Sequence, residues 1–327
     1  MNTERDASMD WKNRKKMSLF LVGAFLLFFI ISCSSAKNSQ RGAFGEQYRR
    51  FMEKQRALAA AEEETLKKDS EMTAEGYERL GDSYLRQGNM YMALLQYGRV
   101  LCVDQNQPGI RYKMGRLFLH KGLAEEARRE FEEVLKIDPR YALAYEGMGW
   151  SFFKMGEYGE AEKNLQQAIH LDHDLWQAHH LLGIVYDRQR QFDEAISEYK
   201  IALGLKPNAG MLLNNLGMSF LSIGNYEEAI TSFTEALRLE PSNKKIQNNL
   251  GLALCKSGKY QEALEVFKKS GDEASAYNNL GCLYMMDGKY AEAIEAFEKA
   301  LEVKPGFYIK AYENLKKAKS AYQAPSQ

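Results

Sequence analysis

The chain has 327 residues, of which 45% are hydrophobic and 27% charged, and its 44 Lys and Arg residues balance 44 Asp and Glu residues. This balance argues against a nucleic-acid-binding protein, because neutralising phosphates requires a basic excess. Four cysteines are too few for a disulfide-built scaffold, and six prolines argue against a disordered or fibrous chain. We therefore expect an ordered chain beyond its N-terminal segment.

The N-terminal segment has the pattern of a secretory signal. Basic residues precede an uninterrupted apolar run over residues 17–31. A secretory signal has such a run of about 7–15 residues, whereas a membrane-spanning helix needs about 20. We expect residues 1–32 to form a signal peptide. An uncut signal anchor is the alternative, and both place the rest of the chain outside the cytoplasm.

Residues 30–33 (IISC) resemble the lipobox of bacterial lipoproteins. The resemblance implies cleavage after Ser32 and attachment of lipid to Cys33. Several acyl chains on one residue exceed the two membrane signals that stable anchoring requires. Ser34 stands where an aspartate would imply retention in the inner membrane. We therefore expect a lipid-anchored protein of the bacterial envelope, at the outer membrane and facing the periplasm.

The sequence predicts a tether and then a helix after the lipidated cysteine. Residues 33–45 are small and polar and have little to bury, which is typical of a flexible tether. Residues 46–73 include a run of Ala, Leu and Glu that favours a helix. A coiled-coil site is the alternative, but the apolar residues do not keep a heptad spacing.

One pattern recurs seven times in the body of the chain. A Leu-Gly or Met-Gly pair returns every 34 residues, except for a last interval of 30. An alanine follows each glycine by 12 positions and a large residue by 16. The glycines are Gly81, Gly115, Gly149, Gly183, Gly217, Gly251 and Gly281. This pattern resembles the tetratricopeptide repeat (TPR) family, which implies an all-α, right-handed superhelix (α-solenoid) of helix-turn-helix repeats.

The period sets the expected repeat boundaries. The seven repeats cover residues 74–107, 108–141, 142–175, 176–209, 210–243, 244–273 and 274–307, followed by a capping helix and tail over 308–327. We expect the glycine of each repeat to contact the alanine of its second helix, with the large residues filling the space between repeats. Repeat six is four residues short, so its second helix should end at Gly271 and Asp272 should cap the next helix.

The resemblance also implies a concave groove lined by the first helix of each repeat. Repeats five to seven place asparagine pairs there: Asn214, Asn215, Asn248, Asn249, Asn278 and Asn279. Carboxamides both donate and accept hydrogen bonds, and the spacing resembles the asparagine ladder with which some TPR domains hold an extended peptide. Met218, Leu252 and Met285 would add a soft apolar lining. Purely structural contacts of the asparagines are the alternative.

A second candidate patch lies in repeats two and three. Tyr112, Arg116, Trp150 and Phe153 fall at groove positions, and aromatic residues beside charges are typical of protein-contact hot spots. Packing of these residues against the helix over 46–73 is the alternative.

Catalytic and metal-binding signals are weak. Four histidines gather at one repeat junction: His170, His173, His179 and His180. They span a helix end, a loop and a helix start, so we predict no metal site. A metal site formed by these histidines is the alternative. No P-loop, G-x-S-x-G, HExxH or CxxC pair occurs. We therefore expect no enzyme, no cofactor, no small-molecule substrate and no bound nucleic acid.

These features together predict a membrane-anchored protein-interaction scaffold. The signal, Cys33, the repeats and the short junction at 270–272 resemble the pilus-assembly TPR lipoproteins of the TadD and PilF (PilW) type. That resemblance implies a secretin or pilus-assembly subunit as the protein partner. An adaptor for envelope enzymes or for outer-membrane or polysaccharide export is the alternative, and a metal-dependent enzyme at the histidines is a remote one.

Overall fold

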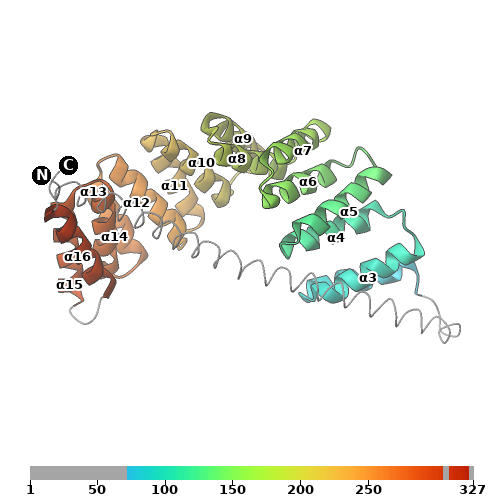
Figure 1. Cartoon of the computed structure of the whole chain (residues 1–327), viewed down its shortest axis with the longest axis horizontal. Helices are drawn as coiled ribbons and strands as arrows, with labels where there is room; N and C mark the ends of the chain where they lie inside the picture. Colours follow the sequence, from blue (N-terminus) through green and yellow to red (C-terminus); the bar gives the residue numbers. More distant parts are fainter. Residues whose placement is uncertain (1–71, 305–308, 324–327) are drawn as a thin grey trace, which may run out of the picture. The chain divides into compact units, whose positions relative to one another are not determined.

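The computed structural model describes residues 72–304 and 309–323, and its regular elements in these ranges are all α-helices (Figure 1). The predicted signal peptide, Cys33 and the tether lie outside the described residues, as does nearly all of the helix expected over 46–73. Within the described ranges, no helix combines the length and the apolar character needed to cross a bilayer.

The chain divides into two compact units, Met1–Pro139 and Arg140–Gln327. The described part of the first unit contains α2 (Ala74–Arg86), α3 (Met90–Val103), α4 (Pro108–His120) and α5 (Ala124–Ile137). The second contains α6 (Ala142–Met155), α7 (Tyr158–Leu171), α8 (Trp176–Gln189), α9 (Phe192–Leu205), α10 (Gly210–Ser222), α11 (Tyr226–Leu239), α12 (Lys244–Lys256), α13 (Tyr260–Ser270), α14 (Glu273–Met286), α15 (Tyr290–Val303) and α16 (Ile309–Gln323).

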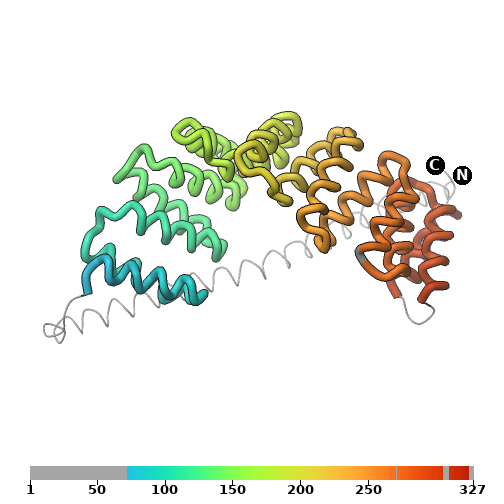
Figure 2. The backbone as a smooth tube through the Cα atoms, turned by 180° about the vertical axis from the view of Figure 1, so that it is seen from behind, coloured from blue at the N-terminus to red at the C-terminus, as the bar shows by residue number. Residues whose placement is uncertain are grey.

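Consecutive helices pack as pairs, one pair for each predicted repeat. Within the second unit, α6 packs on α7, α8 on α9, and so on to α14 on α15, as the tube drawing shows (Figure 2). Within the second unit, each second helix also contacts the helix that follows it, from α7 on α8 to α15 on α16. The prediction of an all-α TPR solenoid is confirmed.

The turn inside each repeat needs a left-handed residue at the end of the first helix. Gly156 caps α6 with φ 86° and ψ 9°, a conformation that glycine adopts without strain. Repeat four has Arg190 at this position, and Arg190 adopts the same conformation with φ 62° and ψ 24°. The turn there keeps the shape of the others at the cost of a strained, non-glycine residue.

The repeat glycines make room for a large side chain of their own repeat. A Cβ atom placed on Gly183 would lie 2.6 Å from Cε1 of Tyr199, and one on Gly217 would lie 2.7 Å from Cε1 of Phe233. Leu165 takes this role against Gly149 in repeat three. The prediction that each glycine mainly contacts the alanine of its repeat is therefore wrong. The large residue, one helical turn beyond the alanine, reaches the glycine of its own repeat. It also belongs to the core between repeats, since Tyr199 and Phe233 cluster with buried residues of neighbouring repeats.

The short sixth repeat has the predicted ends. Helix α13 has 11 residues, against 14 for α11, and Gly271 follows its last residue. Oδ1 of Asp272 accepts a hydrogen bond from the backbone N–H of Ser275 at 2.9 Å. Asp272 is thus the N-cap of α14, which confirms the prediction and lets the next repeat begin without a longer loop.

Helix α16 covers the last repeat. Its Leu315 and Ala318 join Ala293 and Phe297 of α15 in one buried cluster. Without α16 this apolar surface would be exposed to water, which is why a repeat array needs a cap.

Candidate protein-binding face

The first helices of the second unit share one surface. Helix α6 contacts α8, α8 contacts α10, α10 contacts α12, and α12 contacts α14. We call the surface formed by these five helices the first-helix face. Most of the residues predicted to bind a partner belong to it, so its side chains decide what it can bind.

Asn214 and Asn249 link two neighbouring first helices. Asn214 is only 5% exposed. Its Oδ1 accepts a hydrogen bond from Nδ2 of Asn249 at 2.8 Å, and its Nδ2 donates to Oδ1 of Asn215 at 3.3 Å. Asn249 is half-buried and offers a second N–H and a carboxamide oxygen beyond this bond. The pair therefore joins α10 to α12 while Asn249 keeps spare hydrogen-bonding capacity.

His180 and Asn215 make the equivalent link one repeat earlier. Nδ2 of Asn215 lies 3.0 Å from Nε2 of the buried His180. Because a carboxamide nitrogen only donates, Nε2 must accept, which requires a neutral imidazole. Burial lowers the pKa of His180 to about 4, which keeps the ring neutral. The rings of Trp176 and Tyr199 lie beside it, with centroids 6.5 and 6.0 Å away.

The remaining asparagines differ in their exposure. Asn278 is 7% exposed, and its Oδ1 accepts from Nδ2 of Asn314 on α16 at 3.1 Å. Asn248 is exposed and Asn279 is half-buried. The predicted ladder is therefore partly engaged inside the protein, since Asn214 and Asn278 connect neighbouring helices. The second asparagine of each pair corresponds to the ladder position of the TPR domains that the spacing resembles, and Asn215, Asn249 and Asn279 all reach the surface.

The expected apolar lining lies on the same face. Met218 on α10, Leu252 on α12 and Met285 on α14 are each half-buried. Met211 and Met286 are more exposed, at 49% and 66%. Methionine side chains are unbranched and adapt to irregular partners, so this row suits varied apolar side chains.

The second predicted patch falls in both units, and each half forms its own contacts. In the first unit, Nη1 of Arg116 donates to the hydroxyl of Tyr112 at 3.0 Å, and the guanidinium lies 5.9 Å from that ring centroid. In the second unit, Nζ of Lys154 lies 5.5 Å from the centroid of Trp150. Phe153 packs beside Tyr158 of α7, with centroids 5.8 Å apart.

The four histidines have different surroundings. His170 and His173 are exposed, whereas His179 and His180 are buried. Nδ1 of His179 lies 2.6 Å from Oε2 of Glu198 on α9, so its partner is a carboxylate inside the repeat. Over the described residues, no group of three or more His, Cys, Asp or Glu side chains is placed to hold a metal ion.

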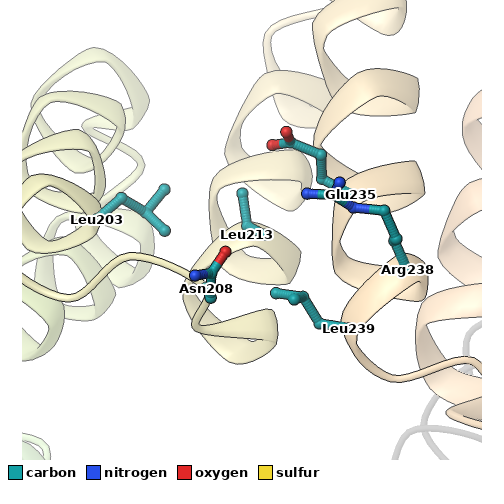
Figure 3. A pocket seen from close by; sticks show the side chains of 6 residues that line it. All are labelled: Leu203, Asn208, Leu213, Glu235, Arg238 and Leu239. Carbon is teal, nitrogen blue, oxygen red and sulfur yellow. The ribbon is translucent and has the colours of Figure 1, made fainter.

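A small pocket opens elsewhere in the second unit (Figure 3). It lies between α9, the loop that follows it, α10 and α11. Its lining consists of Leu203, Asn208, Leu213, Glu235, Arg238 and Leu239. None of these residues was predicted to bind a partner, and the pocket is separate from the row of asparagines and methionines.

Stacked helix pairs, a packed glycine in each first helix and a shared first-helix face define a TPR protein, a class of generally non-enzymatic scaffolds that bind protein partners. Residues 274–307 match the tetratricopeptide repeat model, and residues 35–278 match the family described as the cilia and flagella-associated protein 70 C-terminal domain. Because the second match spans more than half of the chain, the chain belongs to that family.

Two solved structures with TM-scores above 0.5 agree on the fold. A tetratricopeptide repeat protein from Parabacteroides merdae ATCC 43184 is 15% identical with a TM-score of 0.53, and the match covers 75% of this chain and 98% of that one. A chain of the APC/C hetero-tetramer Cut9-Hcn1 is 22% identical with a TM-score of 0.52, and the match covers 80% of this chain and 51% of that one. MamA is 29% identical with a TM-score of 0.45, and the match covers 51% of this chain and 97% of that one. No curated protein matches the sequence significantly.

Proposed function

We propose that the chain is a scaffold anchored to a bacterial envelope membrane, where its first-helix face binds a segment of a protein partner. The observation that carries this proposal is the row of surface-reaching asparagines and methionines on α10, α12 and α14, which are consecutive contacting helices. Asn215, Asn249 and Asn279 offer hydrogen bonds to a peptide backbone, and Met218, Leu252 and Met285 offer apolar contact.

The membrane anchor and the kind of partner rest on the sequence. The signal and Cys33 support export and lipidation, with the absence of aspartate after Cys33 favouring the outer membrane. The resemblance to TadD and PilF lipoproteins supports a pilus or secretion subunit, such as a secretin, as the partner. The scaffold would then assist the assembly of that machine by holding one subunit near the membrane.

Site-specific photo-crosslinking in cells tests this proposal. A photoreactive amino acid replaces Met218 or Leu252 on the first-helix face, and replaces the exposed Thr234 or Glu265 on second helices as the matched control. We expect both face positions to form an adduct with the same envelope protein and the control positions to form none. An adduct of equal yield at the control positions, or no adduct at the face, contradicts the proposal.

A further inference from the structure

The formal charge of the chain is zero, but the second unit separates its charges between its two sets of helices. On α6, α8, α10 and α12, four of the five helices of the first-helix face, the exposed charged side chains are Lys154, Arg188, Lys244, Lys245 and Lys256. The fifth helix, α14, has one exposed charged residue, Glu273 in its first turn. The two acidic residues of the other four helices are buried or half-buried. Glu146 is 5% exposed, and the half-buried Asp187 accepts hydrogen bonds from Tyr199 and Ser219 at 2.7 Å each.

Most second helices have the opposite balance, whereas α13 has two acidic and two basic residues. Acidic residues outnumber basic ones on α9, α11 and α15, where they lie mostly on the exposed side. A partner that approaches the helices from α6 to α12 therefore meets positive charge on the first helices and negative charge on α9 and α11. The zero net charge hides this difference.

The positions of the cations agree with a role beyond stabilising the helices. Lys154 and Arg188 lie in the last turns of α6 and α8, where the helix dipole favours a cation. Lys244 and Lys245, however, begin α12, where the same dipole disfavours a cation. Helix stability therefore explains the first two residues but leaves Lys244 and Lys245 without a structural reason.

Some of these cations are available to a partner. Among the described residues, no carboxylate lies within 4.0 Å of the Lys154 ammonium or the Arg188 guanidinium. Lys256, two repeats beyond Arg188, is instead paired with Asp287. Lys154 and Arg188 occupy equivalent positions in consecutive repeats, and each follows a half-buried apolar residue by four positions, Trp150 and Ile184 respectively. They therefore present two cations along one edge of an apolar surface.

We propose that the segment bound by the first-helix face is an acidic, amphipathic peptide. Its carboxylates pair with Lys154, Arg188 and Lys245, while its apolar side chains contact the surface around Met218 and Leu252. The inference rests on the proposed function and specifies the chemistry of the partner. Complementary charge steers the encounter and rejects basic segments, whereas the asparagines are indifferent to the sequence of the partner.

Three fluorescent peptides provide the direct test with the full-length protein. Each is about 12 residues long, with identical Leu, Met and Phe at alternate positions and with Glu, Gln or Lys at all others. We expect the Glu peptide to bind about tenfold more tightly than the Gln peptide, and the Lys peptide not to bind, by fluorescence anisotropy. Raising NaCl from about 0.05 to about 0.5 M should remove most of the difference, because salt screens exposed charges.

Charge reversal identifies the surface responsible. Lys154→Glu with Arg188→Glu should weaken binding of the Glu peptide about tenfold and leave the Gln peptide unchanged. Lys163→Glu with Lys269→Glu makes the same change in net charge on the exposed sides of α7 and α13 and should have no effect. Equal binding of the Glu and Gln peptides, no binding of either, or an equal loss in the control variant overturns the inference.

A single-stranded RNA of about 12 nucleotides separates the two sources of negative charge. If RNA binds more tightly than the Glu peptide and loses binding in the Lys154 and Arg188 variant, the assignment of a peptide is overturned. The proposed function fails separately, through the absence of crosslinked adducts at Met218 and Leu252. Adducts at those positions together with equal binding of the Glu and Gln peptides would retain the scaffold and remove only the acidic preference.

Discussion

The contact between a glycine and a large side chain is the smallest feature that specifies the fold. Gly183 leaves room for the ring of Tyr199, which is fully buried and donates its hydroxyl to Asp187. The sequence predicted that this glycine allows close packing but not which side chain it meets. The spacing of 16 residues along the chain says nothing about which helix faces meet, so the contact appears only when the second helix is placed on the first.

Substituting this glycine tests the contact. Gly183→Ala puts a Cβ atom 2.6 Å from a ring that has no space to move, so we expect the free energy of unfolding to fall by roughly 1–3 kcal/mol. Denaturant unfolding provides the measurement. Gly204→Ala in α9 is the matched control, because beyond its chain neighbours and the nearby backbone of α9 no described atom lies within 4 Å of the added Cβ. The free energy of unfolding of the control variant should rise by about 0.5–1 kcal/mol. Equal effects at the two glycines would disprove the close contact.

The pH dependence of stability tests the neutral state of His180. Its pKa is lowered from 6.5 to about 4 by burial, so the unfolded chain binds a proton that the folded chain does not. The stabilising contribution is complete above pH 6.5 and is lost as the pH falls toward about 4. His180→Asn keeps a hydrogen-bonding group opposite Asn215 without a titrating ring. Unfolding curves of this variant should show a smaller loss of stability over that range; an unchanged loss would assign it to other groups.

At the scale of the helices, periodicity predicted the pairs, the short α13 and the cap at Asp272. It did not predict how neighbouring repeats are connected. Asn214 meets Asn249, 35 residues later, rather than the residue at its own repeat position, Asn248. Burial of His180 and the internal use of Asn278 follow from the same stacking. Such contacts depend on three-dimensional placement, which a single sequence does not provide.

The N-cap of α14 can be tested by itself. Asp272→Ala removes the acceptor for the Ser275 N–H and should cost about 1 kcal/mol, whereas Asp272→Asn keeps an acceptor and should cost less. The backbone hydrogen bond from Ser275 lowers the pKa of Asp272. The contribution of Asp272 is therefore complete above its ordinary pKa and is lost as the pH falls through the lowered one. The difference in free energy of unfolding between wild type and Asp272→Ala should therefore shrink in acid. A difference that stays constant with pH would contradict the capping hydrogen bond.

At the scale of the whole molecule, the proposed role combines the repeat array with a lipid anchor. The anchor residue Cys33 is a prediction from the sequence. Labelling cells with palmitate tests it, because wild type should incorporate label and Cys33→Ala should not. The control Cys102→Ala changes an exposed cysteine in the repeats and should label normally. Equal labelling of wild type and Cys33→Ala would disprove lipidation at this residue.

The central claim is that one set of helices, the first of each pair, binds the partner. Hydrogen–deuterium exchange of the full chain, with and without the partner recovered by crosslinking, tests this claim most directly. We predict that bound partner slows exchange in α10, α12 and α14 and leaves α11, α13 and α15 unchanged, because only the former present Met218, Leu252 and Asn279. Protection confined to the second helices would contradict the account.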